Sequence, residues 1–144
     1  MSKLEEQLAE HEGFKPFAYQ DSLGYWSIGY GRLIDEAKGG GISTSEALYL
    51  LRNDIVRHSA ELVHALPWVV TLDETRRNVL TDMAFNMGMH TLLQFRNTLA
   101  AVKRGDWKAA AAGMRNSLWA DQVGNRAKRL ARAMETGTMP KKWW

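Results

Sequence analysis

The sequence predicts an α+β fold, in which a small β-rich lobe and a larger helical lobe are joined by one long helix. Short aromatic and β-branched runs between turn residues occupy about 13–42. A capped and uninterrupted helical pattern covers about 44–66, and the apolar segments of about 67–138 have helical spacing. A further helix is predicted over 1–12, and we assign it to the helical lobe. At 144 residues, the chain is expected to form a single domain.

The β-rich lobe is predicted from two aromatic runs with a turn between them. Phe17–Gln20 and Tyr25–Ile28 flank the turn residues Asp21–Gly24, and glycines interrupt the pattern before Leu33–Ile34. This arrangement indicates a two- or three-stranded antiparallel meander. Because so small a sheet is marginally stable alone, we expect it to pack on helices.

The long helix begins with a recognisable cap. Ser43 and Glu46 have the spacing of a capping box, and Pro67 ends the pattern. The 22 residues between them would span roughly 33 Å, the length of a small domain. Further helical segments are then predicted over 73–87, 92–102, 107–114 and 125–134.

Composition excludes several classes of protein. Apolar residues make up 45% and charged residues 24% of the chain, which is ordinary for a globular domain. Without cysteine the chain forms no disulfide, and the four histidines show no paired metal-ligand spacing. We therefore predict neither a metal nor a cofactor. The sequence shows no signal peptide or membrane-spanning run, so we expect synthesis in the cytoplasm.

Charge is distributed unevenly along the chain. Residues 100–144 carry ten Lys or Arg against three acids, a net charge of +7, whereas residues 1–99 have a net charge of −4. A solvated basic face is the ordinary explanation of such a pattern. It also suits an anionic partner, such as a cell-wall polymer or the anionic lipids of an outer membrane. No nucleic-acid-binding motif accompanies the charge, so we predict no nucleic-acid partner.

Potentially reactive groups gather between Glu12 and Ser27. Glu12 continues the predicted face of Leu4 and Leu8, at the C-terminal end of its helix. Burial and the helix dipole would both favour its protonated form. Asp21 lies nine residues further on, in a polar turn that would keep it ionised, and Ser27 follows six residues later. Two carboxyl groups in contrasting environments suit the general acid and base of glycoside hydrolysis, although each is commonplace by itself.

The full pattern resembles the T-even-type phage lysozymes, the muramidases of glycoside hydrolase family 24. Members of this family carry a Glu, then Asp or Cys after eight intervening residues, and then Thr after five more, followed by Ile-Gly-x-Gly. The stretch from Glu12 through Gly31 is similar to this pattern. The likeness covers about nine-tenths of the chain. The other segments of this chain that resemble the family are Leu72–Gly88, Phe95–Leu99, Gly105–Trp107, Asn125–Arg129 and Thr136–Thr138.

The resemblance implies a lysozyme-like fold and roles for individual residues. Glu12 would protonate the glycosidic oxygen, while Asp21 with Ser27 would position or activate the attacking water. The reaction implied is inverting hydrolysis of the β-1,4 bond between N-acetylmuramic acid and N-acetylglucosamine in peptidoglycan, lysing the host cell wall. By analogy, Arg126 would pair with the catalytic glutamate, and the active site would lie between the lobes. The residues expected to line the saccharide cleft are Leu33, Phe85 and Thr98.

Three positions depart from the family pattern. Ser27 replaces the usual Thr, which keeps the hydroxyl but loses the methyl group that restricts its rotamers. Arg32 stands where relatives often have His, so a His–Asp ion pair is absent. Gly113 occupies a sugar-contacting position that usually carries Asn, so that contact is in doubt.

The resemblance also implies partners and a location. We expect a monomeric endolysin that accumulates in the host cytoplasm and reaches the periplasm and cell wall after a holin opens the membrane. Two alternatives stay open. A lytic transglycosylase would need the glutamate without the water-placing aspartate, and a cationic membrane-disrupting protein would use the basic end and need no catalysis.

Overall fold

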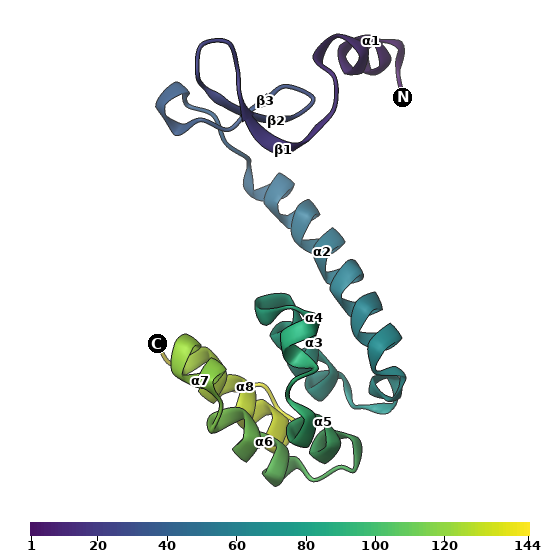
Figure 1. Ribbon diagram of the computed structural model, residues 1–144, viewed down its shortest axis with the longest axis vertical. Helices are drawn as coiled ribbons and strands as arrows, with labels where there is room; N and C mark the ends of the chain where they lie inside the picture. Colours follow the sequence, from purple (N-terminus) through teal and green to yellow (C-terminus); the bar gives the residue numbers. More distant parts are fainter. The chain divides into compact units, whose positions relative to one another are not determined.

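The computed structural model describes residues 1–144 and confirms the predicted α+β class (Figure 1). The chain divides into two compact units, unit 1 (Met1–Leu50) and unit 2 (Leu51–Trp144), which are described separately. Helix α2 (Thr44–Ala65) contributes residues to both units and matches the predicted long helix. The grouping of the whole chain into one domain, with helix 1–12 in the helical lobe, stays a prediction.

Unit 1 begins with a capped helix and continues into a small sheet. Helix α1 (Lys3–Glu12) starts at a capping box made by Ser2 and Glu5. The strands β1 (Lys15–Gln20), β2 (Trp26–Gly29) and β3 (Arg32–Leu33) then form an antiparallel sheet in the order β1-β2-β3. The three-stranded form of the predicted meander is therefore the one observed.

The first strand is longer than its sequence suggests. It begins at Lys15 and includes Pro16, whereas the pattern places its start at Phe17. Because β1 lies at an edge of the sheet, a proline there need not remove a ladder hydrogen bond. The pairing also shifts between Lys15 and Tyr19, an irregularity that accommodates the extra residues.

The predicted cap of α2 is present. The Ser43 amide donates to Glu46 Oε2 at 2.7 Å, and the Glu46 amide donates to Ser43 Oγ at 3.2 Å. A short 3₁₀ helix, η1 (Glu36–Lys38), lies between β3 and this cap, and Asp35 caps it through a hydrogen bond from the Ala37 amide. Local side-chain caps therefore define most of the element boundaries in unit 1.

Unit 2 is helical throughout. Within the predicted segment 92–102 the helix starts only at Arg96, because Leu92 ends the preceding helix and the chain turns between these two residues. A six-residue helix over Leu118–Val123 was not predicted from the sequence. The elements are η2 (Pro67–Thr71), α3 (Glu74–Met87), α4 (Met89–Leu92), α5 (Arg96–Lys103), α6 (Trp107–Arg115), α7 (Leu118–Val123) and α8 (Asn125–Thr136).

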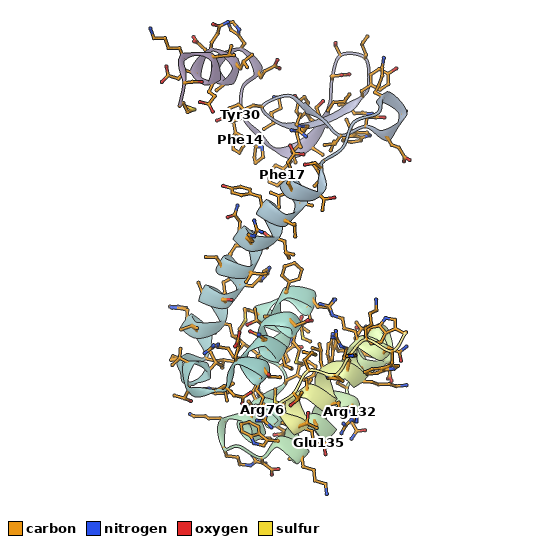
Figure 2. The ribbon with its side chains drawn as sticks, turned by 180° about the vertical axis from the view of Figure 1, so that it is seen from behind. Phe14, Phe17, Tyr30, Arg76, Arg132 and Glu135 are labelled. Carbon is orange, nitrogen blue, oxygen red and sulfur yellow. The ribbon has the colours of Figure 1, made fainter.

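The core of unit 2 is built on α3, α6 and α8. Met83, Met114 and Met134 are fully buried, and alanines on α6 and α8 allow the helices to approach closely. Arg76 closes one end of this core, since its guanidinium donates to the carbonyls of Met134 (2.7 Å) and Glu135 (3.0 Å) at the end of α8 (Figure 2). The same guanidinium lies over the Trp107 ring, 4.0 Å from its centroid.

Helix α1 lacks a buried face in unit 1. Leu4 is 60% exposed and Leu8 is 47% exposed, and α1 contains no buried residue. Unit 1 by itself therefore does not provide the covered Leu4–Leu8 face that the sequence predicts. No helix of the chain is both long enough and apolar enough to cross a membrane.

Candidate active site

Glu12 lies beside the turn between β2 and β3. It is the last residue of α1, which ends at Gly13 with a φ of 69°, and its side chain is exposed. A Cβ atom built on Gly31 would lie 2.7 Å from Glu12 Oε2, so the Glu12 carboxylate would have to move if position 31 carried a side chain. Gly31 itself has a φ of 75°, which also favours glycine. Gly31 thus leaves room for the Glu12 carboxylate beside this turn.

Asp21 has one anchored and one available carboxylate oxygen. Its Oδ1 accepts hydrogen bonds from the amides of Leu23 and Tyr25, both at 2.9 Å, and these bonds fix the turn between β1 and β2. Its Oδ2 accepts no hydrogen bond from the protein. A carboxylate held in this way can orient a water molecule through its second oxygen.

Ser27 lies at the centre of one face of the sheet. It pairs directly with Tyr19 on β1 and with Leu33 on β3, so the three side chains point to the same side. Ser27 is only 6% exposed, and its hydroxyl makes no hydrogen bond to another protein group. We call the surface made by Tyr19, Ser27 and Leu33 the Ser27 face.

The turn residues extend the Ser27 face. The Asp21 amide donates to the Tyr25 carbonyl at 2.8 Å. Asp21 comes two residues after Tyr19, and Tyr25 comes two residues before its partner Ser27. By strand alternation, Asp21 and Tyr25 continue the same face. Two of the three predicted catalytic residues, Asp21 and Ser27, are therefore brought together by the sheet, with Leu33 beside them.

Phe85 and Arg126, two predicted substrate contacts, line one pocket of about 390 Å³ in unit 2. Arg126 donates from Nε (3.0 Å) and Nη2 (2.7 Å) to Asp82 Oδ1, an ion pair between α8 and α3. The predicted pairing of Arg126 with Glu12 stays a prediction, whereas Asp82 is the partner observed within unit 2. The pocket is lined by Leu51, Ile55, Asn78, Thr81, Asp82, Phe85 and Arg126.

Thr98 is buried where α5 meets α6, with only 6% of its surface exposed. A Cβ atom on Gly113 would lie 2.2 Å from Thr98 Oγ1, so the backbone of α6 approaches this hydroxyl closely. The sugar contact predicted for Thr98 has little surface available to it here. The missing side chain at position 113 is likewise explained by packing between the two helices.

Comparison with known proteins connects this geometry to a family. The phage lysozyme family model matches residues 9–135. The chain belongs to the phage lysozyme family. This membership makes it a lysozyme-type glycosidase.

The relatives of this chain differ in how much of their own length it covers. Probable T4-type lysozyme 1 of Dictyostelium discoideum is 29% identical over 165 residues, covering 96% of this chain and 97% of that protein. Peptidoglycan hydrolase gp36 of Pseudomonas phage phiKMV is 30% identical over 89% of this chain and 14% of its own length. An endolysin of Acyrthosiphon pisum secondary endosymbiont phage 1 is 30% identical, covering 73% of this chain and 70% of its own.

Arg32, a departure from the phage lysozyme pattern, has a defined role in unit 1. Its guanidinium forms a bidentate ion pair with the Glu46 carboxylate and also donates to the Gly41 carbonyl at 3.2 Å. Hydrogen bonds from Arg32, and then from Ser43, lower the pKa of the Glu46 carboxyl from 4.5 to about 2. This ion pair therefore ties β3 to the start of α2.

Sequence reasoning missed the aromatic and basic members of the Ser27 face. Tyr19 and Tyr25 lie beside Ser27 and Asp21, and the ammonium groups of Lys15 and Lys38 lie over their rings. The alternation of the strand residues could have identified Tyr19 and Lys15. Nothing in the local sequence indicates Lys38, since its position depends on the path of η1.

Proposed function

We propose that this lysozyme hydrolyses the β-1,4 bond between N-acetylmuramic acid and N-acetylglucosamine in bacterial peptidoglycan, with inversion, and so lyses the host cell wall. Glu12 protonates the glycosidic oxygen as general acid. Asp21 positions or activates the attacking water, with the Ser27 hydroxyl as its second hydrogen-bonding partner. The arrangement that best supports this proposal is the Ser27 face, where the free oxygen of Asp21 and the unpaired hydroxyl of Ser27 belong to one surface.

The different environments of the two carboxyl groups support different roles for Glu12 and Asp21. Asp21 Oδ1 is engaged by two amides, which hold the carboxylate in place while Oδ2 accepts from water. The Glu12 carboxyl is exposed beside Gly31, so a glycosidic oxygen can approach it. Water attacks the anomeric carbon as the leaving oxygen takes the proton of Glu12, and the Asp21 carboxylate accepts the proton released by the water.

Replacing the proposed acid tests the proposal directly. Glu12→Gln is expected to lower kcat about 10²- to 10⁴-fold on purified peptidoglycan, because a glutamine cannot donate the proton. Glu10→Gln, an exposed carboxyl on the same helix, is the matched control and should retain activity. Near wild-type release of reducing ends by Glu12→Gln would contradict the assignment.

Product chemistry distinguishes hydrolysis from the alternative lytic transglycosylase reaction. Mass spectrometry should show reducing muramic ends, whereas 1,6-anhydro ends would replace the proposed reaction by transglycosylation. Proton NMR during the first turnovers should show the α-anomer, since attack by water from the opposite face inverts the β bond. An initial β-anomer would instead require a retaining mechanism.

Ser27 offers a finer test of the water site. Ser27→Ala should lower kcat because the water loses a hydrogen-bonding partner, whereas Ser27→Thr keeps the hydroxyl and should stay active. Equal kcat values for Ser27→Ala and the wild type would remove Ser27 from the mechanism.

We further propose that Leu33, Phe85 and Arg126 contact the saccharide. Leu33 belongs to the Ser27 face, while Phe85 is 38% exposed and shares its pocket with Arg126. Variants at these positions should raise KM more than they lower kcat, because they remove contacts away from the reacting bond. The sugar contact of Thr98 stays a prediction as well, since Thr98 is as exposed as Ser27, at 6%.

A second proposed partner is the anionic lipid of the outer membrane. Arg129 Nε donates to the Pro140 carbonyl at 2.7 Å, which ties the segment containing Lys141, Lys142 and two tryptophans to basic helix α8. Indoles beside lysines suit the interface of an anionic bilayer. If killing of intact cells survives Glu12→Gln, membrane disruption contributes without catalysis; loss of killing would leave hydrolysis alone responsible.

Action from the host cytoplasm after a holin opens the membrane, and a monomeric state, complete the proposal. Expression with and without a holin, followed by a lysis assay, tests the first. Gel filtration with light scattering tests the second, and a stable dimer would contradict it.

A further inference from the structure

Two lysine–tyrosine pairs accompany the proposed catalytic groups on the Ser27 face. The Lys15 ammonium lies 5.2 Å from the centroid of the Tyr19 ring, and Tyr19 pairs directly with Ser27. The Lys38 ammonium lies 4.7 Å from the centroid of the Tyr25 ring, and the Tyr25 amide donates to Asp21. Each lysine therefore lies over a tyrosine whose backbone is paired with, or hydrogen-bonded to, a proposed catalytic residue.

Both ammonium groups are available to a ligand. Lys15 and Lys38 are exposed, and neither has a carboxylate of the protein within 4.0 Å. Their tyrosine rings are half-buried in the sheet, so each ring restricts where its lysine can reach. Arg32, the other cation near the sheet, is already occupied by Glu46.

The chemistry of the pair indicates what it would recognise. An ammonium group carries three donors and attracts carboxylates, and a tyrosine face keeps it close to the surface without neutralising it. In peptidoglycan the glycan is largely neutral and hydroxylated, whereas the stem peptides attached to muramic acid carry free carboxylates. The cations are therefore suited to the peptide part of the substrate.

We propose that Lys15 and Lys38 bind carboxylates of the stem peptide and make this enzyme selective for stems whose carboxyl groups are free. The proposal rests on the peptidoglycan hydrolysis proposed above. It assigns the two lysines to substrate binding, and it leaves proton transfer and water activation to Glu12, Asp21 and Ser27. Each lysine would contribute to KM and leave kcat unchanged.

Chemical amidation of the substrate provides the decisive comparison. Purified peptidoglycan is used untreated or after its stem carboxylates have been converted to methylamides with a carbodiimide and methylamine. On untreated substrate, Lys15→Ala and Lys38→Ala should each raise KM about fivefold, the effect of one modest ion pair. On amidated substrate, wild type and variants should have the same raised KM. Lys3→Ala, which removes an exposed cation from α1, is the matched control and should match wild type on both substrates.

Salt dependence and inactive-enzyme binding complete the test. Added salt should weaken wild-type binding to untreated peptidoglycan more than it weakens binding by the double variant, because salt screens the ion pairs. Binding of Glu12→Gln protein to intact sacculi reports on the lysines even if the enzyme proves not to be a hydrolase. An unchanged KM, an equal loss on both substrates, or undiminished sacculus binding by Glu12→Gln protein that also lacks both lysines would overturn the inference. Absence of reducing ends with the wild type would instead overturn the proposed function.

Discussion

Unit 1 and unit 2 are stabilised in different ways. Every buried apolar side chain lies in unit 2, at Leu62 or later, where residues of α2 through α8 form one continuous core. In unit 1 the only buried residue is Ser27, a polar one. Unit 1 instead depends on backbone ladders, capped turns and the Arg32–Glu46 ion pair.

The difference matters because the proposed reactive groups all belong to unit 1. Glu12, Asp21 and Ser27 are positioned by a helix end, an Asp-anchored turn and a strand pairing, respectively. Such elements have few apolar contacts, so they open locally at a lower free energy than a packed core. We therefore expect substitutions in unit 2 to change global stability and substitutions in unit 1 to change activity first.

The largest expected effect on stability comes from the core of unit 2. Met83→Ala should reduce the free energy of unfolding by about 2–5 kcal/mol, because it removes a fully buried side chain and leaves a cavity. Urea unfolding followed by circular dichroism measures the loss. Leu50→Ala in unit 1 is the comparison variant; Leu50 is 51% exposed, so its loss should stay below about 1 kcal/mol. Equal losses would show that the two units share one core.

A smaller effect is expected where α5 and α6 touch. Gly113→Ala should destabilise the protein by about 1–3 kcal/mol, because the new methyl group would meet Thr98 Oγ1 at 2.2 Å. Thr98→Ala in the same chain removes the obstructing hydroxyl and should restore most of the loss. The double-mutant cycle, measured by thermal unfolding, gives the coupling between the two positions. Additive effects would contradict the close packing.

Sequence patterns predicted those features of the fold that depend on neighbouring residues. The capping box of Ser43 and Glu46 and the end of α2 before Pro67 both lie where their residue types indicate. The break between α4 and α5 was missed because no proline or glycine marks it. Helix α7 was missed because it is only six residues long.

For the candidate site, sequence reasoning predicted the reactive groups but not their neighbours. Glu12, Asp21 and Ser27 follow from local chemistry and spacing. The register of the strands determines that Tyr19 and Leu33 flank Ser27. A one-residue shift of a strand would turn its side chains to the other face of the sheet. The burial of Thr98 depends on the missing side chain of Gly113, a contact between two helices that neither segment shows alone.

The smallest expected effect concerns the ion pair that ties β3 to α2. The pKa of Glu46 is lowered from 4.5 to about 2, so the pair stabilises unit 1 above pH 4.5 and is lost as the pH falls through about 2. Arg32→Gln should raise the pKa of Glu46 while leaving it below 4.5, because the Ser43 amide still donates to the carboxylate. Carboxyl NMR titration of Glu46 measures the shift, with Lys3→Gln as the control for loss of one cation. Because both side chains are exposed, added salt should weaken the effect, and an unchanged titration would show that the Ser43 cap alone lowers the pKa.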